Sequence, residues 1–346
     1  MRRRLQVSAF LVLLAAGAAL AWSLSGLWTP ARPEGASQVF HVGPGESLRS
    51  VALRLQAEHL LPERVLFGPR VVVAFARVVG IDHQIKSGEY DVAPSLTPIE
   101  ILERLVSGNV KTYAVTLPEG LRLDEIGARM EEVEITTSVD FLERARDPSF
   151  VAEFGIEAET LEGYLYPETY RFRRNTPSEA VLRTMVEQFR AAWTEKDREL
   201  LKRSGMSLHQ VLVLASIVEK ETGVPEERPR IAAVFHNRLR RGMRLQSDPT
   251  VIYGVLHTRG TFDGNIRRRD LRTDTPYNTY TRSGLPPGPI ASVSMAAIRA
   301  VLDPEDVSFL YFVSRNNGTH VFSATLAEHN RAVQRYQKRR RRKNPS

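Results

Sequence analysis

The N-terminal segment constrains the structure of this chain more than any other feature. Met1–Arg4 is basic, and Leu5–Leu27 carries no charge and is mostly Leu, Ala and Val. A helix needs about 20 consecutive apolar residues to cross a bilayer, so this stretch is long enough to span one. A cleaved signal peptide is the alternative, because small residues at Ala16–Ala21 offer a cleavage site. The run is longer than a typical signal core, which favours a retained transmembrane helix.

The charges around this helix predict its orientation. Arg2–Arg4 precede it, and no matching basic cluster follows directly. The positive-inside rule then places the N-terminus in the cytoplasm and every residue after Pro30 outside the cytoplasmic (inner) membrane. We expect five segments, which are an anchor with its cytoplasmic end at 1–28, a linker at 29–37, an N-terminal α+β region at 38–160, a second α+β domain at 161–336 and a basic tail at 337–346.

Charge and composition exclude several classes of protein. The net charge is +8, but Arg2–Arg4 and Lys338–Lys343 together carry nine positive charges, so the body between them is nearly neutral. A nearly neutral body argues against a nucleic-acid-binding surface. The absence of cysteine excludes disulfides, thiolate metal sites and a cysteine nucleophile. The histidines lack metal-ligand spacing and no phosphate-binding glycine loop is present, so we expect no metal and no cofactor.

A weak internal repeat lies in the first half. Val39–Leu55 and Tyr113–Met130 each combine a candidate strand, a Pro/Gly/Glu turn and an amphipathic helix. A further strand is expected at Gly88–Val92, and Thr97 caps a helix that stops at Gly108. The repeat resembles small strand–helix modules of the LysM type, which hold glycan chains. Two ordinary strand–helix units in one α+β domain are an equally good interpretation.

The second half mixes strands and helices without regular βαβ alternation, which suggests an α+β fold. We expect a long helix through Ala180–Leu200 and an almost wholly apolar helix at Leu208–Glu221. The sequence FLYFVSRNNGTHVFS at 309–323 predicts two short strands joined by an Asn-Asn-Gly turn. Thr325 and Glu328 form a capping box for a last helix.

Two glutamates at the end of the apolar helix are candidates for acid–base chemistry. Val211–Val218 is apolar on every face except at Ser216, so this helix is expected to be buried. Glu219 and Glu221 follow, where apolar walls and the helix dipole disfavour a negative charge. That environment suits a general acid. The plainer interpretation is that both residues mark the solvated end of a core helix.

Four segments resemble one known family, the endolytic murein transglycosylases, also called YceG-like proteins. They are LEGYLYPETYRF at 161–172, ASIVEKETGVPEERPRIAAVFHNRLRRGMRLQSDPTVIYG at 215–254, YNTYTRSGLPPGPI at 277–290 and FLYFVSRNNGTHVFSATLAEHN at 309–330. The segments occur in the family's order, and the one through Glu219 is long and specific. The resemblance covers the chain after the anchor, apart from the tail that begins at Lys338.

The resemblance implies that Glu219, rather than Glu221, is the catalytic residue. It implies lyase-type cleavage between N-acetylmuramic acid and N-acetylglucosamine within peptidoglycan strands, which leaves 1,6-anhydro ends. An internal hydroxyl nucleophile has a high effective concentration, so one carboxyl group suffices. Asp248 as a second carboxylate would instead give a hydrolytic muramidase. A peptidoglycan-binding scaffold without activity is the third alternative, although such a protein is expected to have lost Glu219.

Other polar side chains in the matched segments are candidates for substrate binding. Each could equally brace a loop by hydrogen bonding. They are Glu162, Tyr166, Gln246, Asp248, Asn278 and Tyr280. Pro286–Pro289 (PPGP) is expected to form a rigid wall. The expected partners are peptidoglycan glycan strands, the membrane through the N-terminal helix and, by family resemblance, cell-wall glycan synthases.

Overall fold

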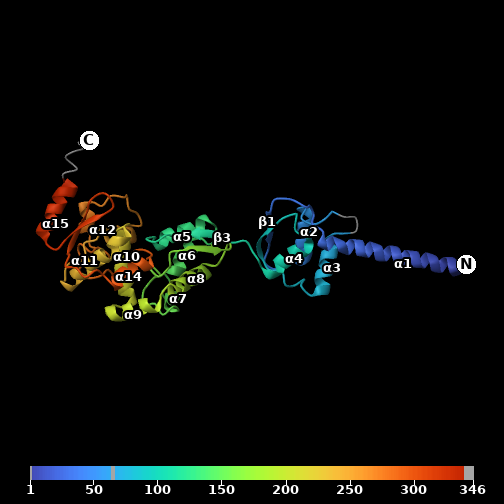
Figure 1. Ribbon diagram of the computed structural model, residues 1–346, viewed down its shortest axis with the longest axis horizontal. Helices are drawn as coiled ribbons and strands as arrows, with labels where there is room; N and C mark the ends of the chain where they lie inside the picture. Colours follow the sequence, from blue (N-terminus) through green and yellow to red (C-terminus); the bar gives the residue numbers. More distant parts are fainter. Residues whose placement is uncertain (1, 64–66, 339–346) are drawn as a thin grey trace. The chain divides into compact units, whose positions relative to one another are not determined.

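The computed structural model describes residues 2–63 and 67–338 (Figure 1). The chain divides into two compact units, Met1–Tyr113 and Ala114–Ser346. This division differs from the expected boundary between residues 160 and 161. Residues 114–160 belong to the second unit because their helices and turns bond to its later segments. The Leu121 amide, for example, donates to the Ser292 hydroxyl at 3.1 Å.

The first unit begins with a long apolar helix. Within the described residues, Phe10–Trp28 has the length and composition to cross a membrane, in agreement with the predicted anchor. The elements of this unit are α1 (Arg2–Ser25), η1 (Gly26–Trp28), β1 (Gln38–Val42), α2 (Leu48–Ala57), α3 (Pro69–Val79), β2 (Gly88–Val92) and α4 (Pro98–Ser107).

A small core holds the first unit together. Strands β1 and β2 pair antiparallel, with Phe40 opposite Tyr90, and both rings are almost fully buried against the helices. Thr97 and Glu100 form the predicted capping box of α4, which ends at Gly108 in the left-handed conformation. Leu27 of η1 is also part of this core, so the chain leaving α1 is fixed to the unit before the segment predicted as a linker begins.

The second unit contains the remaining elements. They are β3 (Tyr113–Thr116), which begins at the boundary, α5 (Leu123–Glu132), α6 (Ser138–Ala145), α7 (Pro148–Ala152), β4 (Thr169–Phe172), α8 (Ser178–Ala191), α9 (Glu195–Ser204), α10 (Leu208–Glu221), η2 (Pro225–Glu227), α11 (Arg228–Arg240), α12 (Asp248–Arg259), α13 (Arg268–Arg272), α14 (Met295–Leu302), β5 (Tyr311–Ser314), β6 (His320–Ser323), α15 (Leu326–Val333) and η3 (Gln334–Lys338).

Helix α10 is the central element of the second unit and packs against α11 and α14. Its apolar residues from Val211 to Val218 are almost fully buried, as its all-round apolar sequence predicts. Ser216, the one polar residue in that run, donates to the Val213 carbonyl and accepts from the Ile290 amide at 3.0 Å. This hydroxyl therefore fixes the proline-rich segment along α10.

The mixed α+β class is confirmed, and most predicted elements are present. The strands β5 and β6 form the predicted antiparallel hairpin, and Thr325 and Glu328 cap α15. The two copies of the repeat form β1 with α2 and β3 with α5, in different units.

One helix prediction is wrong. Ala180–Leu200 is not a single helix, because Thr194 starts a new one, α9, through a capping box with Asp197.

Candidate active site

Glu219 lies in the last turn of α10 with its carboxylate enclosed. The Glu219 side chain is only 2% exposed. Its Oε1 accepts a hydrogen bond from Arg228 Nη2 at 2.8 Å. Its Oε2 accepts two hydrogen bonds from Ser294, from the amide at 2.8 Å and from the hydroxyl at 2.5 Å. Three donors, one of them charged, therefore hold the carboxylate in one orientation.

Local structure explains how these partners reach Glu219. Helix α10 ends at Glu221, and the backbone of its C-cap residue, Thr222, is extended. The η2 turn at Pro225–Glu227 then starts α11, which begins with Arg228. Ser294 is the N-cap of α14, and its hydroxyl also accepts from the Ala297 amide at 3.1 Å.

The environment of Glu219 differs from the expectation drawn from apolar walls alone. The walls are present, but Arg228 is itself 9% exposed and forms a nearly buried ion pair with Glu219. Such a pair depends on good hydrogen-bond geometry because both charges have lost water. A cavity of about 520 Å³, lined by residues of α9, α11 and α14, includes Arg228.

Glu221 faces a different set of partners. Its Oε1 accepts a hydrogen bond from the Ser247 hydroxyl at 2.6 Å. Burial raises the pKa of Glu221 to about 7, a shift that the Ser247 hydrogen bond opposes and the nearby Asp248 charge reinforces. Glu221, two positions along the helix from Glu219, therefore takes up a proton more readily than an ordinary glutamate. Both glutamates are held by the fold, so they do not mark a solvated helix end.

Two predicted site residues lie where α12 begins, Gln246 in the loop before the helix and Asp248 as its first residue. Asp248 is exposed, and its carboxylate accepts from the Tyr280 hydroxyl at 2.7 Å. Gln246 is exposed and has a positive φ of 51°, which is uncommon for a residue other than glycine. The Gln246 amide donates to the Thr279 carbonyl at 3.2 Å. The loop that carries Tyr280 therefore supports both residues.

Asn278 has the loop-bracing role. It is 1% exposed, and its amide nitrogen donates to the carbonyls of Asp270, Leu271 and Thr273. Its side-chain oxygen accepts from the Tyr280 amide at 2.8 Å. Asn278 thus positions the loop from within. A direct contact between its side chain and a glycan strand would require these bonds to break.

Glu162 borders a cavity of about 840 Å³. Its carboxyl oxygens accept from the Leu123 amide at 3.2 and 3.3 Å and from the Tyr253 hydroxyl at 3.1 Å. Burial raises the pKa of Glu162 to about 7, while the Leu123 and Tyr253 hydrogen bonds lower it. The rings of Tyr253, His257 and Tyr277 pack together on the cavity wall.

The proline-rich segment forms another wall of this cavity, as predicted. Pro287, Gly288 and Pro289 line it, and the Pro287 carbonyl is 2.8 Å from His209 Nε2. Gly163 has a φ of 79°, and a Cβ there would lie 2.4 Å from Pro289 Cβ.

Tyr166, another predicted site residue, is half-buried, and its carbonyl accepts from the Tyr170 hydroxyl at 2.7 Å.

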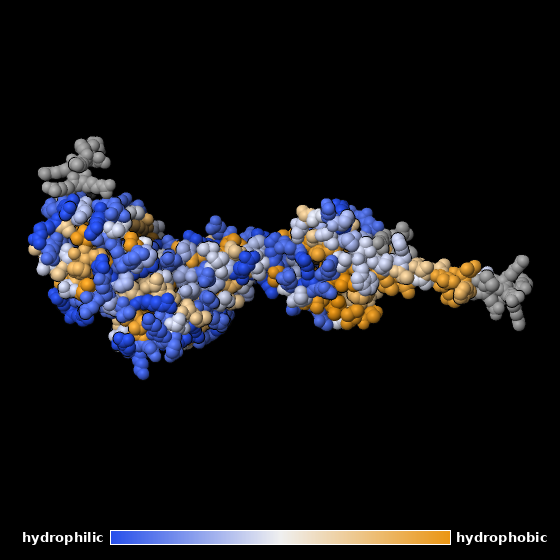
Figure 2. Space-filling model, viewed as in Figure 1, coloured by the Kyte–Doolittle hydropathy of each residue, from blue (hydrophilic) through white to orange (hydrophobic). Residues whose placement is uncertain are grey.

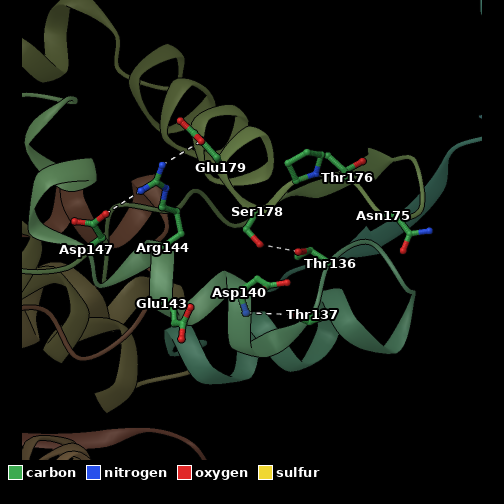
Figure 3. Close-up of a pocket in the computed structure, with 11 residues that line it drawn as sticks. Thr136, Thr137, Asp140, Glu143, Arg144, Asp147, Asn175, Thr176, Ser178 and Glu179 are labelled. Atoms are coloured by element: carbon green, nitrogen blue, oxygen red, sulfur yellow. Dashed lines mark hydrogen bonds and ion pairs between the residues drawn. The ribbon is translucent and has the colours of Figure 1, made fainter. Parts of the chain in front are cut away.

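A second polar hollow lies elsewhere in this unit. It has a volume of about 590 Å³, and Figure 3 shows it between α6, the loop before α8 and the start of α8. Arg144 in this hollow is paired with Asp147 at 2.8 Å and Glu179 at 3.2 Å. Thr136 and Ser178 join their hydroxyls at 2.7 Å. Its lining contains none of the predicted site residues.

Three of the candidate glutamates lie in separate clusters along α10 and its neighbours, apart from the group that Asp248, Asn278 and Tyr280 form. Glu219 is hydrogen-bonded to Arg228 and Ser294, Glu221 is hydrogen-bonded to Ser247, and Glu162 is hydrogen-bonded to Tyr253. Sequence reasoning did not single out Arg228 or Ser294. Arg228 lies in the long segment quoted above, but no spacing rule links it to Glu219. Ser294 is 75 residues away in sequence, and only its N-cap position before Met295 could have attracted attention.

Comparisons with known proteins agree with this architecture. A crystal structure of a YceG-like protein from Listeria monocytogenes superposes with a TM-score of 0.59 at 31% identity, covering 86% of this chain and 98% of that one. An endolytic murein transglycosylase of Bacillus subtilis is 33% identical over 267 residues, which are 72% of this chain and 73% of the relative.

A relative of the same name from Streptococcus pneumoniae R6 is 30% identical over 285 residues. These cover 72% of this chain, and the chain spans about half the length of that relative. The model of the YceG-like family matches residues 40–335, a range that contains Glu219, its two partners and both other clusters. This chain belongs to the YceG-like family.

Proposed function

We infer that this protein is an endolytic murein transglycosylase, which cleaves the bond between N-acetylmuramic acid and N-acetylglucosamine within peptidoglycan strands. The family match over residues 40–335 and the relatives from Bacillus subtilis and Streptococcus pneumoniae that carry this name support the inference. The observation that carries the assignment of the residue is the buried, triply hydrogen-bonded carboxylate of Glu219 at the end of the core helix.

In the proposed reaction Glu219 acts first as an acid and then as a base. Its carboxyl group, which enters the reaction protonated, gives that proton to the glycosidic oxygen, and the bond from that oxygen to C1 of the muramic residue breaks. The C6 hydroxyl of the same residue attacks C1 and closes the 1,6-anhydro ring. Its proton goes to Glu219, which restores the acid. No water is consumed, and one group performs both transfers.

The partners of Glu219 have separate roles in this reaction. Arg228 and the Ser294 amide stabilise the carboxylate that exists between the two proton transfers. The Ser294 hydroxyl also donates to Oε2 in the unbound protein and stays there in the proposed reaction, so the glycosidic oxygen binds beside it. Catalytic hydrogen bonds of this kind often form only when the substrate is bound.

A hydrolytic muramidase that uses Asp248 as a second carboxylate is the alternative. Asp248 is exposed and hydrogen-bonded to Tyr280, while Glu219 is bonded to Arg228 and Ser294. The two carboxylates therefore have different hydrogen-bond partners. Among the described residues no hydrogen-bond partner is common to both of them, so the contacts do not support a mechanism that uses them as a pair. A scaffold without activity is the other alternative, and the retained acid with its ordered partners argues against it.

Product analysis separates these functions. Purified, uncrosslinked glycan strands are digested by the protein, and the fragments are analysed by mass spectrometry. The lyase reaction gives fragments with anhydro ends, which are lighter by one water than the reducing ends of a hydrolase. Reducing ends alone would identify a muramidase, and intact strands with retained binding would identify a scaffold.

The first unit is proposed to hold glycan strands in the manner of a LysM module. This proposal is based on the order of elements in the unit. Along the chain, two helices separate the strands β1 and β2, which pair antiparallel. Deleting Gln38–Gly108 should weaken retention on glycan strands, while a thermal melt checks that the remainder folds. A folded deletion variant with unchanged retention would refute this role.

The site is proposed to lie outside the cytoplasmic membrane, with α1 as a single retained span. The basic start of the chain and the apolar helix motivate this orientation. C-terminal fusions to reporters that work on only one side of the membrane test it, and activity of the cytoplasmic reporter alone would contradict it. Work beside glycan synthases is proposed from family resemblance, and co-purification from crosslinked membranes would test it.

A further inference from the structure

The first unit exposes an apolar surface next to the point where α1 ends. Helix α3 is strongly two-sided, with Val72, Val73 and Ala76 buried in the core. At its C-terminal end Val78 is 88% exposed and Val79 is 54% exposed. Figure 2 shows apolar colour on this part of the unit, continuing onto the apolar helix α1. Exposed apolar side chains that gather in this way mark a contact surface.

Trp28 connects this surface to the candidate membrane span. It is the last residue of the span, it is 61% exposed, and its ring packs edge-on against Phe75 of α3 with centroids 6.3 Å apart. Tryptophan is enriched where a membrane-spanning helix leaves the hydrocarbon and enters the headgroup region. The preceding residue, Leu27, is fully buried in the core of the unit, so α3 and the end of the span are fixed together.

The geometry points to the lipid headgroup region of the membrane as the partner of α3. We propose that Trp28, Val78 and Val79, which we call the α3 surface, rest in the outer boundary of the same bilayer that α1 crosses. In Figure 1, α3 lies on the side of the unit from which α1 emerges, and it runs across the direction of α1. In that position α3 presents Val78 and Val79 to the membrane surface, while Val72, Val73 and Ala76 stay in the core of the unit.

The charged residues of α3 fit this partner. Its charged residues, Arg70 and Arg77, are both basic and exposed. Arg77 is 3.7 Å from Asp82 and keeps its guanidinium at the surface, where lipid phosphates would lie. Arginine stems commonly cover apolar surface while their charged ends reach the headgroups. The contact would hold the first unit against the membrane and limit the region in which the enzyme meets new glycan strands.

The test uses the full chain in vesicles of phosphatidylethanolamine and phosphatidylglycerol. Because the natural sequence has no cysteine, one cysteine can be introduced and labelled with a polarity-sensitive fluorophore. Val78→Cys reports on the α3 surface. Val39→Cys is the matched control, since Val39 is 45% exposed on β1 of the same unit and β1 lies on the side away from α1 in Figure 1. Leu14→Cys, within α1, reports insertion of the anchor.

We expect the label at position 78 to emit at shorter wavelength than the label at 39. Nitroxide lipids labelled near the headgroup should quench it more than lipids labelled deep in the chains, and the order should reverse at position 14. Adding Val79→Glu should return the emission at 78 towards that at 39. A water-like, unquenched label at 78 would overturn the proposal. A label at 78 with shifted emission that lipids do not quench would also overturn it, because another protein surface would then cover α3. Failure of the label at position 14 to insert would overturn it as well.

Discussion

Ser294 donates two hydrogen bonds to one oxygen of Glu219, from its backbone amide at 2.8 Å and from its hydroxyl at 2.5 Å. The hydrogen bond from the backbone amide depends only on the path of the main chain. The hydrogen bond from the hydroxyl requires that residue 294 be a serine. The two can therefore be separated by mutation. The same hydroxyl caps α14 by accepting from the Ala297 amide, so the cap of a core helix and the candidate acid share one atom.

Ser294→Ala should lower activity more than it lowers stability. Losing a hydrogen bond to a charged group is typically worth about 1.5–3 kcal/mol, so kcat/KM on glycan strands should fall about ten- to hundred-fold. Loss of the N-cap should reduce the free energy of unfolding by about 1 kcal/mol. Initial rates of anhydro-end formation and urea unfolding curves measure the two effects.

Ser207→Ala is the matched control, because Ser207 is the N-cap of α10 and accepts from the Gln210 amide. It removes a serine cap from the helix that carries Glu219 but leaves the contacts of the carboxylate intact. It should lose similar stability and keep most of its activity. Equal loss of activity in both variants would mean that the Ser294 hydroxyl acts only through the helix cap.

Stability should fall as pH rises, in part because of Glu162. Burial raises the pKa of Glu162 in the folded state to about 7 from an ordinary value of 4.5. Between these values the folded protein binds more protons than the unfolded chain. The contribution of Glu162 to stability is therefore complete below pH 4.5 and is lost as pH rises through 7. A shift of this size corresponds to about 3 kcal/mol as an upper bound.

Glu162→Gln removes this contribution, so the variant should gain stability relative to the natural protein between pH 5 and pH 8. Chemical denaturation at several pH values measures the difference. Glu187→Gln, at an exposed position on α8, is the control and should show a constant difference. A Glu162 variant whose difference also stays constant would mean that the buried carboxyl does not change its proton binding on folding.

The sequence was most informative where one segment determines its own structure. The apolar run Val211–Val218, the capping box at Thr97 and the Asn-Asn-Gly hairpin each contain their full pattern within a few residues, and the structure has all three. The break at Thr194 was equally local, but the helical pattern on both sides of it concealed the capping box.

The contacts of the site were less accessible to sequence reasoning. Whether the end of α10 is solvated or enclosed depends on Arg228 and Ser294, which fold back from separate helices. Family resemblance predicts a role for Glu219 but points to neither of these partners. For Asn278 the sequence left substrate binding and loop bracing open, and the structure shows the bracing, because its amide nitrogen donates to three carbonyls of the same region.

Gly163 should tolerate no side chain. Its φ of 79° is left-handed, and a Cβ would meet Pro289 Cβ at 2.4 Å. Gly163→Ala should therefore reduce the free energy of unfolding by about 1–2 kcal/mol from the backbone and by a further 1–3 kcal/mol from crowding. Gly155→Ala is the control, with a φ of 62° and nothing within 4 Å. Similar melting temperatures for the two variants would show that Pro289 moves aside without a penalty.

The central prediction concerns Glu219→Gln. The substitution keeps the size of the side chain but removes the proton that the glycosidic oxygen needs. General acid–base catalysis is typically worth about 10²–10⁴-fold, and one group here performs both transfers, so the loss should reach the top of that range. Arg228 is left without its carboxylate, and breaking a buried ion pair from one side typically costs about 3–5 kcal/mol. A lower melting temperature is therefore expected as well.

Three comparisons keep the assignment of Glu219 testable despite that loss of stability. Rates are measured well below the melting temperature of each variant. Glu221→Gln changes the half-buried glutamate two positions further on, about 200° around the helix, and should retain most activity because Ser247 can still donate to an amide oxygen. Glu219→Asp shortens the side chain but keeps an acid, so it should recover part of the activity that Gln loses. If folded Glu219→Gln still releases anhydro ends at a rate near that of the natural protein, the acid is another residue, and Glu221 and Asp248 are the next candidates.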